Sequence, residues 1–122
     1  MPHDPEKYLH DILSSCEFLL EFTGGRTVQD YAGDRAFRSA VERELQIIGE
    51  AVMQLERIAP EVAGRIPEHR DIIGFRHVLV HGYASLQPAT VWGVIESKLP
   101  VLTREVQTLL SELGGEHNAS DR

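Results

Sequence analysis

Apolar residues recur every three or four positions over four long stretches of this 122-residue chain. This period places side chains on one face of an α-helix, whereas a half-buried strand requires alternation with a period of two. The sequence contains no stretch with the strand period and no internal repeat. The pattern therefore predicts an all-α fold, an up-and-down four-helix bundle of four to five helices.

Start and stop signals set the expected limits of these helices. Asp4 and Asp34 are suitable N-caps, and Pro5 suits a first helical turn. Pro100 lies inside the last apolar stripe, which predicts a kink near residues 96–100. We expect long helices at residues 5–22, 35–59, 68–82 and 88–113, with turns or short helices at residues 27–33 and 60–67.

Length and composition bound the class of protein. A chain of this size forms one domain, here residues 1–113, and the polar residues 114–122 are expected to be a disordered tail. The single cysteine, Cys16, excludes a disulfide framework and is expected in the core. No apolar run reaches the ~20 residues of a membrane span, and no signal peptide is evident. We expect a cytoplasmic protein with no membrane partner.

The charge balance bears on possible partners. The chain carries 12 Lys and Arg against 19 Asp and Glu, a net charge of -7. Affinity for nucleic acid comes mainly from phosphate neutralisation by Lys and Arg, so the global charge opposes it. An RNA ligand would need a locally basic groove or a partner that delivers it.

One segment combines residues that suit chemistry on a phosphodiester. Arg76, His81 and Tyr83 stand at i, i+5 and i+7 of the expected third helix. Arg76 and Tyr83 then lie within roughly 20° of each other, and His81 is offset by roughly 140°. Histidine can transfer a proton near neutral pH, and arginine can hold phosphate oxygens bidentately. One imidazole cannot readily act as both acid and base, so a two-fold dimer is expected to supply the second.

Other polar residues near this segment have more than one interpretation. His77 and His81 have the i, i+4 spacing of a helical zinc site, but no glutamate follows His77 and no third ligand is evident. We therefore expect no metal, and His77 is interpreted as a surface or interface residue. Glu50 either orients Arg76 or His81 or is an ordinary helix glutamate. Trp92 is interpreted as a core or dimer contact.

The Arg76-x4-His81-x-Tyr83 pattern resembles the signature of the HEPN superfamily, in particular its HepT-like toxin branch. The resemblance covers most of the chain. It extends to segments on three of the expected helices: Ile48-Gly49-Glu50-Ala51, Ile72-Ile73-Gly74-Phe75-Arg76, and the pairs Val91-Trp92 and Leu99-Pro100.

The resemblance implies a homodimer with the motif in a cleft at the dimer interface. It implies a metal-independent ribonuclease that needs no cofactor to cut RNA, encoded beside a minimal nucleotidyltransferase antitoxin. That antitoxin would use ATP to place AMP on Tyr83, blocking the cleft with bulk and negative charge.

Two hypotheses follow. In the first, the chain is an endoribonuclease toxin of a type VII-like toxin–antitoxin system that cuts mRNA or tRNA. Arg76, His81 and Tyr83 carry the site, Glu50 and His77 support it, and the products are a 2′,3′-cyclic phosphate and a 5′-hydroxyl. In the second, it is a non-catalytic HEPN accessory subunit that binds a nucleotidyltransferase or a nucleotide.

Overall fold

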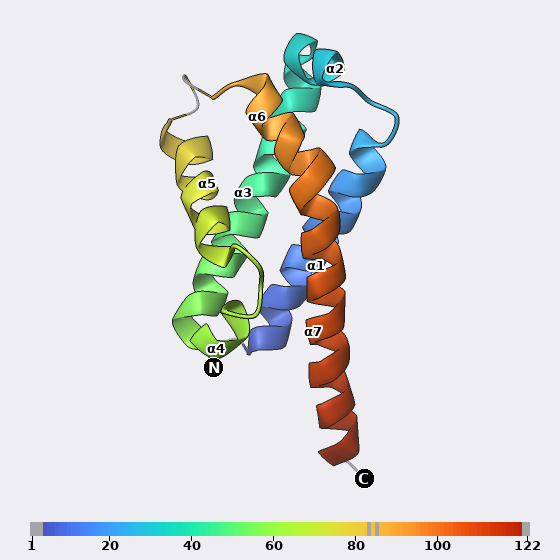
Figure 1. The fold of residues 1–122 in the computed structure, drawn as a ribbon, viewed down its shortest axis with the longest axis vertical. Coiled ribbons are helices and arrows are strands. Elements are labelled where there is room, and N and C mark those ends of the chain that lie inside the picture. The colour runs from blue at the N-terminus through green and yellow to red at the C-terminus, as the bar shows by residue number, and fades with distance from the viewer. Residues whose placement is uncertain (1–3, 83, 85, 121–122) are drawn as a thin grey trace.

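The computed structural model describes residues 4–82, 84 and 86–120, with residues 115–120 described by their backbone only. Within this part of the chain the fold is all-α, as predicted, and no strand occurs. Figure 1 shows the long helices side by side, with short helices at the ends of the bundle. In chain order the elements are α1 (Pro5–Thr23), α2 (Val28–Gly33), α3 (Arg35–Ile58), α4 (Pro60–Ala63), α5 (His69–His81), α6 (Pro88–Gly93), the π-helical turn η2 (Val94–Lys98) and α7 (Leu99–Ser120).

Capping residues begin α1 and α3 where the sequence predicts. The Asp4 carboxylate accepts a hydrogen bond from the Lys7 amide at 3.1 Å. The Asp34 carboxylate accepts from the amides of Ala36 and Phe37 at 3.0 and 3.1 Å. These bonds satisfy amides that have no partner within the helix, so each cap stabilises its helix by about 1 kcal/mol.

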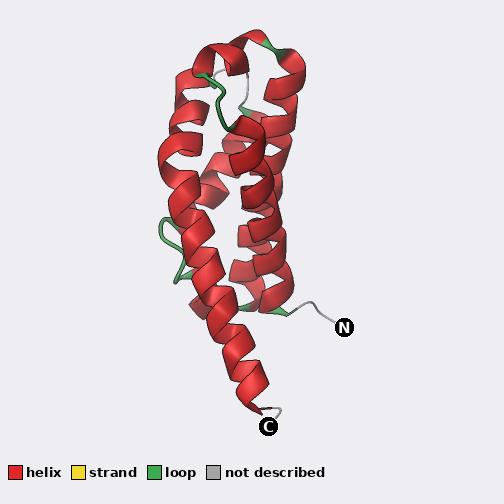
Figure 2. Cartoon of the chain, turned by 90° about the vertical axis from the view of Figure 1, so that its right-hand side faces the viewer, coloured by secondary structure: helices red, strands yellow, loops and turns green. Residues whose placement is uncertain are grey.

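The core lies where α1, α3 and the column formed by α6, η2 and α7 meet. Figure 2 shows these helices running nearly parallel, with the C-terminal end of α7 extending beyond the rest. Cys16 is fully buried, as expected, and Trp92 is 6% exposed, so of the interpretations of Trp92 the core position is the one observed. The Trp92 ring lies 5.9 Å from Tyr31 and 6.2 Å from Phe37, measured between ring centroids.

The last helix departs from α-helical geometry just before Pro100. A proline lacks the backbone N–H and its ring crowds the carbonyl four residues earlier. The chain accommodates this with the π-helical turn over Val94–Lys98, next to the predicted kink, and Figure 1 shows the column changing direction there. α7 then continues to Ser120, past the expected end at Leu113. Disorder of residues 114–122 stays a prediction.

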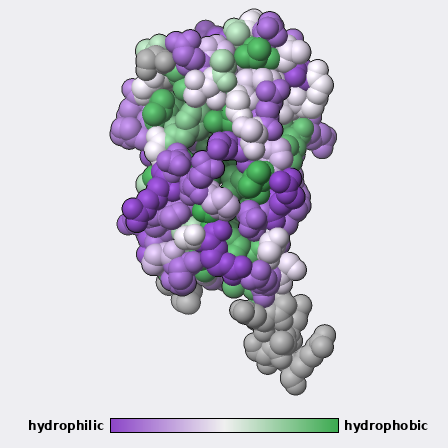
Figure 3. All heavy atoms as spheres, viewed as in Figure 1, coloured by the Kyte–Doolittle hydropathy of each residue, from purple (hydrophilic) through white to green (hydrophobic). Residues whose placement is uncertain are grey.

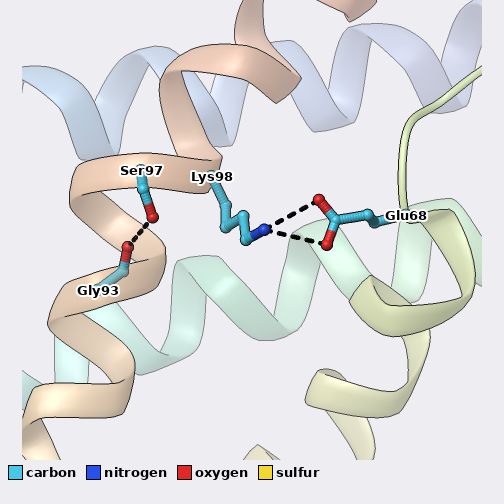
Figure 4. A network of polar contacts seen from close by, with 4 residues as sticks. All are labelled: Glu68, Gly93, Ser97 and Lys98. Atoms are coloured by element: carbon cyan, nitrogen blue, oxygen red, sulfur yellow. Dashed lines mark hydrogen bonds and ion pairs between the residues drawn. The ribbon is translucent and has the colours of Figure 1, made fainter.

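α5 lies on the outside of the bundle and packs chiefly on α3. Leu79 is its only buried residue. Its N-terminal end is tied to η2, because the Lys98 ammonium donates to both carboxylate oxygens of Glu68 at 3.0 Å (Figure 4). No described helix is both long and apolar enough to cross a membrane.

Candidate active site

α5 approaches α3 very closely at Gly49, and this contact positions Arg76. A Cβ atom placed on Gly49 would lie 2.3 Å from the Cβ and 2.9 Å from the Cγ of Arg76. Since real Cβ atoms essentially never approach this closely, only glycine fits at this position of α3. The stem of Arg76 therefore rests directly on the backbone of the central helix.

Glu50, the next residue of α3, faces the guanidinium of Arg76. The Nη2 atom of Arg76 lies 3.2 Å from the Glu50 Oε2 atom, an ion-pair contact. That same oxygen is buried and has no aligned hydrogen bond within the described residues, while the other carboxylate oxygen accepts from Gln54 at 3.3 Å. The contact holds the guanidinium by charge without a bidentate bond. N–H groups of Arg76 thus stay available to a ligand.

Two of the three histidines of α5, His77 and His81, lie together on a different part of its surface from Arg76. The third, His69, pairs with Glu56 at 2.9 Å. The rings of His77 and His81 are 4.7 Å apart between centroids, and both residues are exposed. His81 is offset from Arg76 by roughly 140° around the helix axis, because α5 stays helical as far as His81. No contact between Arg76 and His81 is present among the described residues. Tyr83 lies outside the described residues.

A polar groove of about 630 Å³ runs between α1, α3 and α5, and Arg76 forms part of its wall. Contact of Glu50 with Arg76 is one of the interpretations that the sequence allows, but the sequence does not predict the other polar residues of this groove. The detectable signal was the spacing of Arg43 and Glu50, which stand at i and i+7 and so share a face of α3. The further polar residues that matter here are Lys7, Asp11, Gln46 and Gln54.

A second cavity, of about 300 Å³, lies on the other flank of α5. Its walls are mostly apolar and come from α3, α5, η2 and α7, with Ile48, Phe75 and Leu102 among them. Figure 3, which views the molecule from the same side as Figure 1, shows hydrophobic surface in the middle, surrounded by hydrophilic residues. The arginine of the motif lines the polar groove and not this cavity.

The arrangement supplies a fixed cation beside a polar groove and two exposed imidazoles on the same helix. These groups suit binding of a phosphodiester and transfer of protons to or from it. Among the described residues, no group of three or more His, Cys, Asp or Glu is arranged to hold a metal ion.

Comparison with known proteins agrees with this chemistry. The family model described as Ribonuclease HepT-like matches residues 12–109. This chain belongs to the HepT-like ribonuclease family. The matched span runs from the middle of α1 to α7 and includes Gly49, Glu50, Arg76 and His81. No solved structure matches the chain significantly.

Three relatives match this chain over nearly their whole length. A protein of Caldanaerobacter subterraneus subsp. tengcongensis, provisionally named an RNase, is 34% identical over 108 residues, covering 88% of this chain and 96% of its own. A protein of Methanocaldococcus jannaschii, also provisionally named an RNase, is 27% identical over 117 residues. The match covers 96% of this chain and 96% of that protein. The Probable ribonuclease HepT of Thermococcus cleftensis is 28% identical, covering 89% of this chain and 98% of its own.

Proposed function

We propose that this HepT-like chain is a metal-independent endoribonuclease toxin of a type VII-like toxin–antitoxin system. Family membership and the names of the relatives support ribonuclease chemistry. The observation that carries the proposal is the guanidinium of Arg76, held at the wall of a polar groove by Glu50 with N–H groups left for a phosphate.

In the proposed reaction, His81 acts as the general base or the general acid at the phosphodiester of an RNA strand. A base takes the proton of the 2′-hydroxyl, and the 2′-oxygen forms a bond to the adjacent phosphorus. The bond to the 5′-oxygen breaks, and an acid gives that oxygen a proton. The products are a 2′,3′-cyclic phosphate and a 5′-hydroxyl. Arg76 stabilises the negative charge that builds on the phosphate oxygens.

A homodimer completes this site, because the reaction needs an acid and a base while each chain offers one motif histidine. The outward face of α5 suits pairing with a second copy. Val78 is exposed there, and a Cβ placed on Gly74 would meet nothing within 4 Å. A second α5 can therefore approach closely at Gly74 and bring its own His81 toward the first.

Neutralisation is proposed to occur at Tyr83, through transfer of AMP from ATP by a minimal nucleotidyltransferase antitoxin. Tyr83 follows His81 by two residues, so a phosphate on its oxygen places negative charge beside the site and repels RNA. Co-expression with a minimal nucleotidyltransferase antitoxin should raise the intact mass of the protein by one or more AMP units. Tyr83→Phe should abolish this increase.

The decisive assay incubates the purified protein with tRNA and mRNA in the presence of EDTA. We expect cleavage to 2′,3′-cyclic phosphate ends, and a decrease of about 10²–10⁴-fold for His81→Ala, the usual contribution of general acid–base catalysis. Arg76→Ala should decrease the rate as well. Equal cleavage by the wild type and His81→Ala would contradict the proposal.

The alternative, a non-catalytic HEPN accessory subunit, is favoured by one observation, the net charge of -7. Growth of cells after induced expression separates the two functions. A toxin arrests growth, and His81→Ala relieves the arrest. An accessory subunit leaves growth unchanged, and Arg76→Ala then weakens binding of the nucleotidyltransferase.

A further inference from the structure

We propose that the polar groove between α1, α3 and α5 binds the RNA strand next to the phosphate that is cleaved. In this inference, which rests on the proposed ribonuclease function, Arg43 contacts a second phosphate of the same strand. Gln46 contacts a base between the two phosphates. Gln54, which lies one turn beyond Glu50 on α3, contacts a base on the other side of Arg76. These three residues stand on the face of α3 that lines the groove.

Among the positively charged residues of the groove, Arg43 differs from the others because its charge is not paired with a carboxylate of the described residues. Lys7 is paired with Asp11 at 2.6 Å, and Arg76 with Glu50 at 3.2 Å. Within the described part of the chain, Arg43 is exposed and forms no ion pair. The groove therefore keeps one uncompensated positive charge, although the whole chain carries -7. A locally basic groove of this kind offsets the unfavourable global charge.

The size and spacing of the groove fit a short length of single-stranded RNA. Its volume of about 630 Å³ lies within the range of small-ligand pockets. Arg43 precedes Glu50 by seven residues, so the two residues are about 10 Å apart along the axis of α3. At about 3.4 Å of rise per stacked nucleotide, a strand covers that distance within about three nucleotides. One strand can thus reach both Arg76 and Arg43.

The groove and the apolar cavity lie on opposite sides of α5, and His81 lies on the side away from the cavity. Viewed along α5, residues Asp71, Ile72 and Phe75 line the apolar cavity and lie on one side of Arg76. His77 and His81 lie on the opposite side, offset by roughly 100° and 140°. A strand that leaves the polar groove across Arg76 therefore moves toward the exposed imidazoles and away from the apolar cavity.

Gln46 and Gln54 are neutral residues of the groove whose side-chain amides can form hydrogen bonds with the edge of a base. The Nε2 atom of Gln54 donates to Glu50 at 3.3 Å, which orients the amide and leaves its oxygen as an acceptor. Gln46 lies one turn of α3 after Arg43 and is half-buried. Amide side chains can donate to and accept from base edges at the same time.

The test compares Arg43→Ala with Arg104→Ala, which removes an exposed arginine of α7 outside the groove. Binding is measured by fluorescence anisotropy of a labelled single-stranded RNA in the His81→Ala background, at several salt concentrations. We expect Arg43→Ala to weaken binding about five- to tenfold and to reduce the salt dependence by about one phosphate contact. Arg43→Lys, which keeps the charge, should retain that dependence. Arg104→Ala should match its parent.

Steady-state cleavage by the otherwise wild-type protein then separates this inference from the proposed function. Arg43→Ala should raise KM and leave kcat within about twofold, because Arg43 does not reach the reacting atoms. If the wild type cuts RNA and Arg43→Ala matches Arg104→Ala in binding and KM, the inference is overturned and the proposed function stands. If no RNA is cut but binding depends on Arg43, the groove assignment stands and the proposed function fails.

The role of Gln46 is tested with a randomised RNA pool whose cleavage ends are sequenced. Gln46→Ala should change the base preference at a nucleotide next to the cut, and Arg104→Ala should not. An unchanged preference in Gln46→Ala would overturn the assignment of this residue to base recognition.

Discussion

Gly49 couples the position of the motif arginine to the packing of the bundle. Gly49→Ala would place a Cβ 2.3 Å from the Cβ of Arg76, so α3 and α5 must move apart. Overpacking of this kind costs about 1–3 kcal/mol, partly offset by the better helix propensity of alanine. We expect a net loss of about 1–2 kcal/mol in the free energy of unfolding, together with reduced RNA cleavage because Arg76 is displaced.

The measurement is urea denaturation combined with the cleavage assay, and Gly93→Ala is the matched control. A Cβ on Gly93 would meet nothing within 4 Å, so this variant should be as stable as the wild type or slightly more stable. A Gly49→Ala protein with wild-type stability and activity would show that the contact has no role in positioning Arg76.

Glu50 has opposite effects on binding and on turnover if it positions Arg76. Glu50→Gln keeps the shape of the side chain and removes its negative charge from the groove. We expect RNA to bind roughly two- to tenfold more tightly, because repulsion of the phosphates is weaker. The same change should lower kcat, because the guanidinium loses the charge that holds it.

Steady-state kinetics should therefore show KM and kcat decreasing together in Glu50→Gln. Glu96→Gln removes an exposed carboxylate of η2 and serves as the control for global charge. A purely structural role of Glu50 would lower stability without this paired change.

The sequence predicts only part of the candidate site. Spacing along a helix shows which residues share a face, but it does not show which residues of different helices come into contact. The contact between Glu50 and Arg76 was one of two interpretations, and the structure places these side chains 3.2 Å apart. Arg43 could not be assigned to the groove, because its place there depends on how α1 and α5 pack around α3. The spacing of Arg76 and His81 indicates that they diverge around the helix, and the described contacts do not bring them together.

Among the helices, α5 is the element on which the proposed dimer depends. Gly74→Trp places a large side chain on its outward face, where a Cβ meets nothing within 4 Å. A single chain should tolerate this change, but a second α5 could no longer approach. We expect Gly74→Trp to be a folded monomer by analytical ultracentrifugation, with RNA cleavage reduced at least about 10²-fold because the second imidazole is missing.

Gly93→Trp is the control for this variant, since Gly93 also faces open space but lies on α6. It should remain dimeric and active. A Gly74→Trp protein that still dimerises and cleaves RNA would place the dimer interface elsewhere.

The limits of the helices were well predicted where local signals determine them. α1 and α3 end within one residue of the expected positions, because caps and prolines act over a single turn. For α2 and α4 the sequence predicts turns or short helices without deciding between them, because so few residues carry too little periodicity. The π-helical form of Val94–Lys98 could not be predicted, because Pro100 requires a distortion without specifying its geometry.

At the scale of the whole molecule, the core favours the protonated form of two side chains. Burial raises the pKa of the Cys16 thiol from 9.0 to about 11, opposed in part by a hydrogen bond with Thr103. Burial, and then the hydrogen bond to Glu42, raises the pKa of Tyr31. In both cases the folded state holds its proton to higher pH than the unfolded state does.

This difference predicts that the protein is less stable in alkali. Well below pH 9 the thiol is protonated in both states, so the contribution of Cys16 is fully present. As the pH rises from 9.0 toward about 11, the unfolded thiol ionises first and the contribution is lost. Urea denaturation should show a loss of up to about 2–3 kcal/mol over this range that is absent in Cys16→Ala. Equal pH dependence in the two proteins would contradict this account.

Because α5 lies at the periphery of the bundle, most residues of α5 that are proposed to serve activity are not needed for folding. The core is built mainly from the other helices, and α5 contributes only Leu79 as a buried residue. Most exposed positions of α5 can therefore change without loss of the folded chain. If the chain is a toxin, as proposed, a genetic screen for loss of toxicity should recover many well-expressed, inactive alleles in this one helix, whereas mutations in α3 should tend to remove protein and activity together.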